Sequence, residues 1–265
     1  KRPIFEVSRP SSTYISLNQA LEYVGDNSTY SKRALYLITF YWIWYGCLFL
    51  GLPVLMGNTD DFNCPSKHGL PFICDEVQAC KKFEPDQLIS TKPWTIAGTF
   101  KLFCTRRNWI PRLNSGMFGA LVFSGFFYPT LANKYGRRPI ILIATFVSSI
   151  SLFMAGFTVS FSSLSVLMIF ASIGFSGLET VGRTWISEIS GVNFKVNSMA
   201  IINMVWAFSQ IFLVFLEKFI DWRSLFKIFF GFLFLLGFGI GYIFIDESPK
   251  FLLLQQQIDV TLKEM

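Results

Sequence analysis

Residues 131–138 read LANKYGRR, and this short polar stretch divides two long apolar segments. A second polar stretch, DESPK at residues 246–250, closes a later apolar segment. The chain around them is 52% hydrophobic and only 15% charged, whereas a soluble domain carries about 25% charged residues. The two polar stretches therefore read as connections in a chain that lies mainly within a lipid bilayer.

Several apolar stretches are long enough to cross a bilayer, because a spanning helix needs roughly 20 mostly apolar residues. Backbone polar groups must be satisfied inside such a segment, which favours helices. The predicted fold class is an all-α integral membrane protein, a bundle of six transmembrane helices with a large outer loop. The predicted spans are 34–56, 114–132, 139–160, 164–186, 197–216 and 224–245.

The two ends of the chain are predicted to lie at the membrane surface. In residues 1–33, Ser16 and Gln19 form a capping-box pattern before a short amphipathic run that ends at Gly25. The basic, serine-containing start of this segment is typical of either an ordinary tail or the end of a trimmed transit peptide. Residues 246–265 are predicted to form an interfacial amphipathic helix that begins after Pro249.

Residues 57–113 form a long polar loop that contains four of the five cysteines, Cys64, Cys74, Cys80 and Cys104. Four thiols in one loop predict two disulfides, with three possible pairings. Such bonds persist only on an oxidising face of the membrane. Two alternatives stay open, namely four reduced cysteines and a zinc site. The zinc site is less favoured because the loop has no Cys-x-x-Cys pair and only one histidine, His68.

The charges predict the orientation of the chain. The short loop between the second and third spans contains Lys134, Arg137 and Arg138. Positive charge in short loops stays on the cytoplasmic or matrix side. The cysteine-rich loop then faces the opposite, oxidising side. Since six spans is an even number, both ends of the chain are expected on the cytoplasmic or matrix side.

Several short segments resemble, in order, the landmarks of the major facilitator superfamily in its organic cation and anion transporter branch. LANKYGRR resembles the loop signature after the second span. The resemblance implies one six-helix bundle of the major-facilitator type, the N-terminal half of a transporter in which two bundles enclose the solute. The other landmarks are LEYVG (21–25), FKLFC (100–104) with Trp109, ISEISG (186–191), DWR (221–223) and ESPKFLL (247–253).

The same resemblance implies a gating motif at the cytoplasmic end of the bundle. Its residues here are Asn133, Gly136, Arg137, Arg138, Glu188 and Glu247. In the family such a charge cluster closes the gate; the alternative is that these residues only hold the spans together. The chain departs from the family at Asn133, where an Asp is usual, because an amide keeps hydrogen bonding but loses the charge. It also has Pro129 in place of a glycine, which can kink the span, and no arginine at the opening of the fourth span, residues 166–170.

Glu179 and Arg183 lie four residues apart in the fourth span, so they share one helix face. Ionisable residues inside a membrane are costly and suggest a functional site. One interpretation is a solute or gating contact, and the other is a self-neutralising pair that fixes the helix orientation. In the sixth span, Gly237 and Gly241 form a Gly-xxx-Gly pair that predicts close helix packing.

Four aromatic residues crowd the first span, Tyr41, Trp42, Trp44 and Tyr45. A cage for an organic cation is one interpretation, and lipid contact and packing is the other. The sequence contains no glycine-rich phosphate loop, no nucleophile set and no metal-ligand spacing. With His68 as the only histidine, acid–base catalysis by histidine is disfavoured. We therefore predict no enzyme activity, no cofactor and no bound metal.

Two functions follow from these observations. The first is a degenerate transporter half that serves as a non-transporting accessory subunit of a larger membrane complex, with the mitochondrial inner membrane as one candidate location and a plasma or vesicle membrane as the alternative. The second is a transporter of small organic ions, completed by dimerisation or by a second chain, in a plasma or vesicle membrane. The first rests on Asn133 and on the expectation that a chain ending at Met265 holds only half of a midplane site. The expected partners are lipid and other membrane subunits or a second bundle, with a small organic ion as the possible solute and no nucleic acid.

Overall fold

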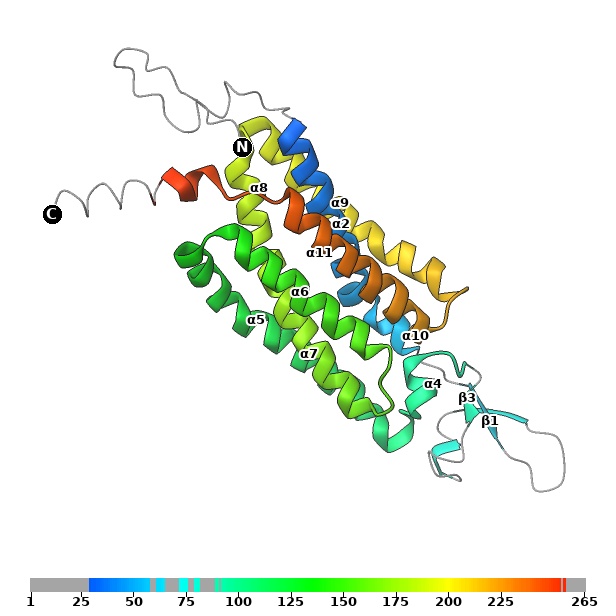
Figure 1. Ribbon diagram of the computed structural model, residues 1–265. Helices are drawn as coiled ribbons and strands as arrows, with labels where there is room; N and C mark the ends of the chain where they lie inside the picture. The colour runs from blue at the N-terminus through cyan, green and yellow to red at the C-terminus, as the bar shows by residue number, and fades with distance from the viewer. Residues whose placement is uncertain are drawn as a thin grey trace, which may run out of the picture.

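Long helices run side by side in one bundle, with the outer loop at one end (Figure 1). The computed structural model describes residues 29–57, 61–64, 72–75, 79–81, 89–90, 92–253 and 255. The predicted surface helix before the first span falls in residues 1–28, which lie outside the described residues. Of the predicted C-terminal helix, residues 249–253 are helical, and the part from residue 256 onward is outside the described residues.

Two π-helical segments each join helices that continue one another. The segment η2 (Leu178–Gly182) joins α7 to α8, and η3 (Leu225–Leu233) joins α10 to α11. The helices are α2 (Thr29–Met56), α5 (Trp109–Tyr135), α6 (Arg137–Ala155), α7 (Phe161–Gly177), α8 (Arg183–Ile189), α9 (Val192–Glu217), α10 (Trp222–Ser224) and α11 (Phe234–Phe244).

Some helices are longer or shorter than the ranges predicted from hydropathy, and the differences lie at polar residues. α5 begins at Trp109 and passes through Pro129 without ending there. α6 ends at Ala155 and not at 160, because residues 156–160 form the turn into α7. In that turn the Thr158 hydroxyl donates to the Ala155 carbonyl at 2.8 Å, and Ser160 caps α7 by accepting a bond from the Ser163 amide at 3.2 Å. Hydropathy alone does not detect such caps.

Among the described residues, 5 helices are long and apolar enough to cross a membrane. They are Cys104–Tyr135, Arg137–Ala155, Phe161–Ile189, Phe194–Glu217 and Trp222–Phe244. α2, which contains the predicted first span, is not one of these five. It is nevertheless 28 residues long, which corresponds to about 42 Å of helix against a hydrocarbon core of about 30 Å. A sixth span at α2 therefore stays a prediction.

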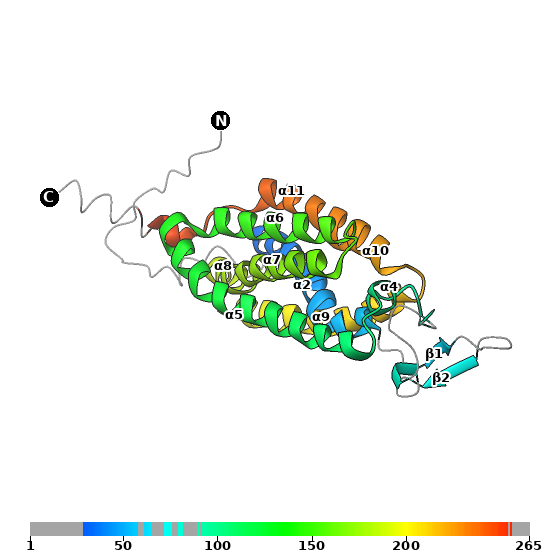
Figure 2. The same cartoon turned by 90° about the horizontal axis from the view of Figure 1, so that it is seen from below.

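The helices form three layers when the bundle is viewed from below (Figure 2). α6 and α11 lie on one side, α5 and α9 on the other, and α2 and α7 lie between them. This central position explains why Tyr41, Trp42, Trp44 and Tyr45 of α2 are all buried. The expectation that lipid contact accounts for part of this aromatic cluster is wrong, because all four of these side chains are buried among neighbouring helices.

α11 packs closely on α2 at the glycine pair of the sixth span. The Tyr41 hydroxyl donates to the Gly237 carbonyl at 2.7 Å. A Cβ at Gly237 would lie 2.6 Å from Phe40 Cε1, and a Cβ at Gly241 would collide with the Tyr41 hydroxyl. The two glycines thus lie where a side chain would force the helices apart.

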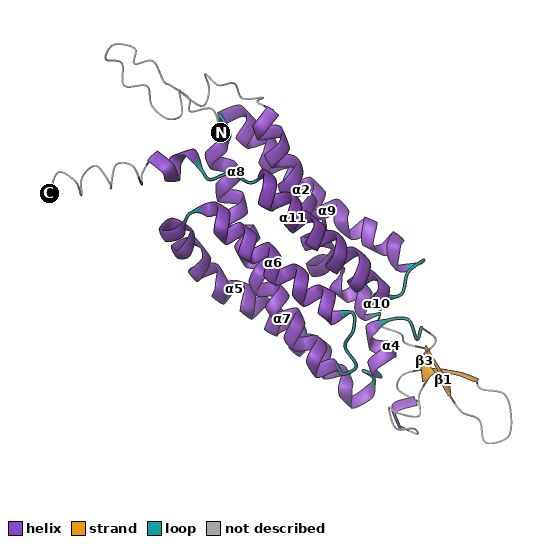
Figure 3. Cartoon of the chain, in the orientation of Figure 1, coloured by secondary structure: helices purple, strands orange, loops and turns teal. Residues whose placement is uncertain are grey.

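The outer loop contains a small antiparallel sheet that the sequence analysis did not predict (Figure 3). Its strands are β1 (Asp61–Cys64), β2 (Phe72–Asp75) and β3 (Ile89–Ser90), in the order β2-β1-β3. Disulfides join Cys64 to Cys74 and Cys80 to Cys104, with Cα–Cα distances of 6.0 and 5.5 Å. The loop returns to the membrane through α4 (Ile96–Phe100) and the 3₁₀ turn η1 (Cys104–Asn108).

Candidate functional site

Gly136 connects α5 to α6 at the end of the bundle opposite the outer loop (Figure 1). Its φ of 100° lies in a region that residues with a Cβ avoid. A Cβ there would also collide with Glu247 Oε2. This glycine therefore permits both the sharp turn between the helices and the close approach of the Glu247 carboxylate.

Arg137 lies at the centre of a buried polar cluster and is 7% exposed. Its Nε and Nη2 donate to Oε2 and Oε1 of Glu188, each at 3.1 Å. Its Nη1 donates to the Ala132 carbonyl at 3.1 Å. A two-pronged arginine–carboxylate pair of this kind fixes both position and orientation, so α6 and α8 are held in one relative arrangement.

Glu247 and Ser248 add the segment after α11 to this cluster. The Arg137 amide donates to Glu247 Oε1 at 2.7 Å, and the Arg138 amide lies 3.3 Å from Glu247 Oε2. A carboxylate at these first amides of α6 also meets the positive end of the helix dipole. The Ser248 hydroxyl donates to Glu188 Oε2 at 2.5 Å. Three separate parts of the chain thus meet at one buried set of charges.

The structure brings together most, but not all, of the residues expected at the gate. Arg138 lies at the edge of the cluster, where its Nη2 donates to the Tyr242 carbonyl at 3.0 Å. Asn133 is exposed on the last turn of α5 and is not a partner of Arg137 or of either glutamate. It lines a small cavity of about 40 Å³ next to Arg137 and Thr184.

The second polar site lies inside the bundle, at Glu179 and Arg183. Arg183 Nη2 lies 3.5 Å from Glu179 Oε1, and the two side chains are 36% and 32% exposed. The Tyr45 hydroxyl of α2 donates to Glu179 Oε2. The Arg183 guanidinium lies 5.1 Å from the centre of the Trp42 ring, a cation–π distance. Two aromatic residues of the first span therefore hold the ion pair in place.

Residues of this site and its neighbours carry hydrogen-bond donors that have no partner among the described residues. Within the described part of the chain, Arg183 Nε, Trp42 Nε1 and Trp206 Nε1 are buried and have no hydrogen-bond partner. Trp206 of α9 also stacks on Tyr45, with 6.5 Å between ring centres. An acid, a base, aromatic faces and free N–H donors are groups that bind an ion. The sequence analysis did not identify Trp206, because its contact with Tyr45 is set by the packing of α9 on α2.

The described residues contain no group of three or more His, Cys, Asp or Glu side chains that could hold a metal ion. The two polar sites therefore offer charges and hydrogen bonds as their chemistry. One lies at the end of the bundle and one in its interior. α8 connects them, since it begins at Arg183 and contains Glu188.

Residues 95–257, more than half of the chain, match the Major Facilitator Superfamily. The chain belongs to the major facilitator superfamily. Over 243 residues it is 23% identical to a protein of Xenopus tropicalis described as "Solute carrier family 22 member 15-like". That match covers 90% of this chain and 47% of the relative, so the chain spans about half the length of the curated relative it matches.

Membership in the major facilitator superfamily confirms the resemblance seen in the short landmarks and the predicted all-helical membrane bundle. The chain is therefore a multi-pass membrane protein of a transporter family. The matched region, 95–257, includes the Arg137 cluster and the Glu179–Arg183 pair. Trp42 and Tyr45 lie before it and reach the pair through the packing of α2.

Proposed function

We propose that this chain is one bundle of a transporter for small organic ions, and that the Glu179–Arg183 pair contacts the solute. One observation carries the proposal: a partly exposed ion pair in a helix long and apolar enough to span a membrane. Placing charged side chains in lipid costs roughly 2.5–3.5 kcal/mol each on insertion scales. A polar pathway next to the pair would remove much of this cost.

The surroundings of the pair support binding in preference to a purely structural role. A structural pair is expected to satisfy its donors internally, because an unpaired buried donor costs about 1–3 kcal/mol. Here Arg183 Nε and two indole N–H groups have no partner among the described residues. A solute with an acidic group would accept from Arg183, and one with a basic group would compete with Arg183 for Glu179.

The Arg137 cluster supports a link between solute binding and a conformational change. α8 contains both Arg183 and Glu188, and Glu188 holds Arg137 and Ser248. A solute that displaces Arg183 would therefore shift α8, and this shift would change the position of Glu188 relative to Arg137 and Ser248. The π-helical turn η2 lies directly before α8, and such turns are often found at functional sites.

The test is uptake of labelled organic cations and anions by the full-length protein in proteoliposomes. We expect saturable uptake that falls at least tenfold in Arg183→Ala and partly recovers in Arg183→Lys. Arg112→Gln, which removes an exposed charge near the start of α5, should transport like the unchanged protein. Absence of saturable uptake, or equal rates in Arg183→Ala and Arg112→Gln, would contradict the proposal.

A second candidate function is an accessory subunit of a larger membrane complex. The observation that favours it is Asn133, which is uncharged and lies outside the buried cluster. The native mass of the solubilised protein separates the two, since a large hetero-complex favours an accessory role and a monomer or dimer favours transport. The comparisons do not support the mitochondrial inner membrane, and we propose the plasma membrane as the location.

A further inference from the structure

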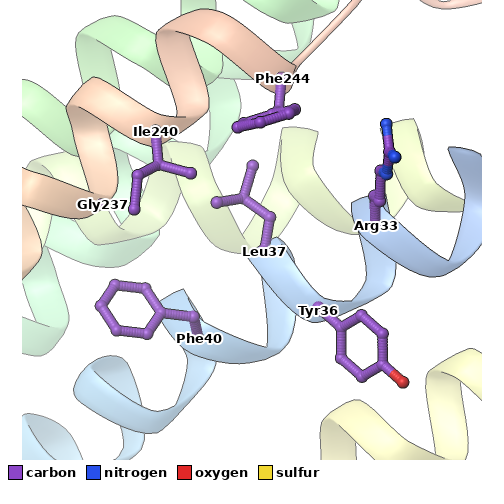
Figure 4. A pocket seen from close by; sticks show the side chains of 7 residues that line it. All are labelled: Arg33, Tyr36, Leu37, Phe40, Gly237, Ile240 and Phe244. Carbon is purple, nitrogen blue, oxygen red and sulfur yellow. The ribbon is translucent and has the colours of Figure 1, made fainter.

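A groove of about 430 Å³ lies between α2 and α11, on the side of the bundle (Figure 4). Leu37 lies near the middle of the groove, and Gly237 lies at the end far from Arg33. Phe40, Ile240 and Phe244 provide further apolar walls. Ile240 is 49% and Phe244 is 50% exposed. In a chain of this family such an exposed apolar groove faces the hydrocarbon of the bilayer and not water.

One end of the groove carries a positive charge. Arg33 of α2 lies beside Phe244 at one end, whereas Phe40 and Gly237 lie toward the other (Figure 4). Both Arg33 and the neighbouring Lys32 are exposed. Tyr36, which also lines the groove, is 73% exposed and belongs to the residue type found where membrane and water meet. The charged end is the end of the bundle that also carries the Arg137 cluster, the predicted cytoplasmic side.

The length of the groove fits part of a lipid acyl chain. Seven residues of helix separate Arg33 from Phe40, which is about 10 Å along the axis. One leaflet of a hydrocarbon core about 30 Å thick is about 15 Å deep, so the groove covers the part of the leaflet next to the headgroups. A charged group at the headgroup level above an apolar groove matches the two ends of a phospholipid.

We propose that this groove, defined by Arg33, Tyr36, Leu37, Phe40, Gly237, Ile240 and Phe244, binds an anionic glycerophospholipid of the cytoplasmic leaflet. Arg33 contacts the headgroup phosphate and acid, and one acyl chain lies along Leu37 and Ile240. The cytoplasmic leaflet is rich in anionic lipids that attract basic residues next to a span. The lipid would thereby brace α11 against α2 at the glycine contact.

A second groove on the same helix provides an internal comparison. It lies between α6 and α11, has about 410 Å³, and is lined by Pro139, Leu142, Ile143, Phe146, Phe238 and Tyr242. No charged side chain is in that lining. Arg138 lies beside Tyr242 at one end of this groove, but its Nη2 already donates to the Tyr242 carbonyl. We therefore expect the second groove to accept lipid chains with a weaker preference for a headgroup than the first.

The test is native mass spectrometry of the full-length solubilised protein, titrated with phosphatidylserine or phosphatidylcholine. The unchanged protein should retain phosphatidylserine at least fivefold more strongly. This is the factor that about 1 kcal/mol per basic residue gives. Arg33→Gln should abolish the preference, and Arg33→Lys should keep it. Ile240→Trp, which fills the groove, should weaken retention of both lipids, and soluble inorganic phosphate should not displace either.

Two matched variants decide whether the effect belongs to this groove. Lys195→Gln removes an exposed charge near the start of α9, at the same end of the bundle. Ile143→Trp fills the second groove at a similarly exposed isoleucine. Both should keep the phosphatidylserine preference. No preference in the unchanged protein, an equal loss in Lys195→Gln, displacement by phosphate, or unchanged retention in Ile240→Trp would overturn the proposal; the last result would mean that another protein segment covers the groove.

Discussion

At the scale of single residues, Gly136 controls how tightly the polar end of the bundle closes. Its φ of 100° and its contact with Glu247 both depend on the absence of a Cβ. The Glu247 carboxylate accepts bonds from the first amides of α6 only in this arrangement. A larger residue would therefore disturb the turn and the cluster together.

We predict that Gly136→Ala lowers the free energy of unfolding by about 1–3 kcal/mol, the usual cost of a non-glycine residue in such a backbone conformation. Thermal unfolding of the solubilised protein measures the change. Gly119→Ala is the matched control, because a Cβ at Gly119 has nothing within 4 Å, and alanine favours a helix over glycine by about 1 kcal/mol. A melting temperature that falls equally in both variants would contradict this account of Gly136.

The sequence predicted part of these residue contacts and missed others for a physical reason. Arg137, Glu188 and Glu247 were expected to form a cluster, because a family motif identifies them. The Tyr45 hydroxyl as partner of Glu179 was not expected. Which aromatic residue of a crowded helix reaches a given carboxylate depends on helix rotation, and adjacent aromatic residues leave that rotation undetermined.

At the scale of helices, the contact between α2 and α11 depends on small residues. Gly237 lies against Phe40, and its carbonyl accepts a hydrogen bond from Tyr41. α2 and α11 also form the two walls of the proposed lipid groove. Their separation therefore affects both the stability of the bundle and the shape of the groove.

Gly237→Ala is predicted to destabilise the protein by about 1–3 kcal/mol through overpacking, because a Cβ would lie 2.6 Å from an aromatic ring carbon of Phe40. Gly239→Ala, two residues along the same helix, should be neutral or slightly stabilising, since a Cβ there has nothing within 4 Å. Parallel thermal unfolding of the two variants measures the difference. Equal stabilities would show that the Gly-xxx-Gly contact does not limit helix packing.

The five described helices that are long and apolar enough to cross a membrane lie at predicted spans, but their ends differ from the predicted ranges. Some helices extend beyond the apolar stretch, as α5 does by beginning at Trp109. Backbone hydrogen bonds can continue a helix into residues that are too polar for the hydrocarbon core. The π-helical turns η2 and η3 were not predicted. A π turn changes the hydrogen-bond ladder by one residue and leaves the apolar pattern of the sequence almost unchanged.

At the scale of the whole molecule, the outer loop and the bundle are held together by covalent and packing contacts. Cys80 is joined to Cys104, which opens the turn that leads into α5. The Phe62 ring of the small sheet lies 4.8 Å from that of Phe103. The sequence left three cysteine pairings open, and its strands of 4, 4 and 2 residues are too short to give a clear alternating pattern.

We predict that peptide mapping of the unreduced protein recovers Cys64 linked to Cys74 and Cys80 linked to Cys104. Reduction should lower the melting temperature, because a disulfide typically contributes about 2–4 kcal/mol by restricting the unfolded chain. The control is Cys47→Ala, which removes the buried free thiol and should leave the disulfide map unchanged. Alkylation of all four loop cysteines before reduction would contradict the predicted pairing.

If Glu179 and Arg183 line a path for an ion, as we propose, water reaches the position of Arg183, and thiol accessibility measures this. The measurement uses the full-length protein with Cys47→Ala and any other free thiol replaced, and compares Arg183→Cys with Ile243→Cys. Ile243 is 71% exposed on α11 and faces lipid in this account. We predict that a membrane-impermeant charged thiol reagent modifies residue 183 but not residue 243. No reaction at residue 183, or equal reaction at both positions, would contradict the claim.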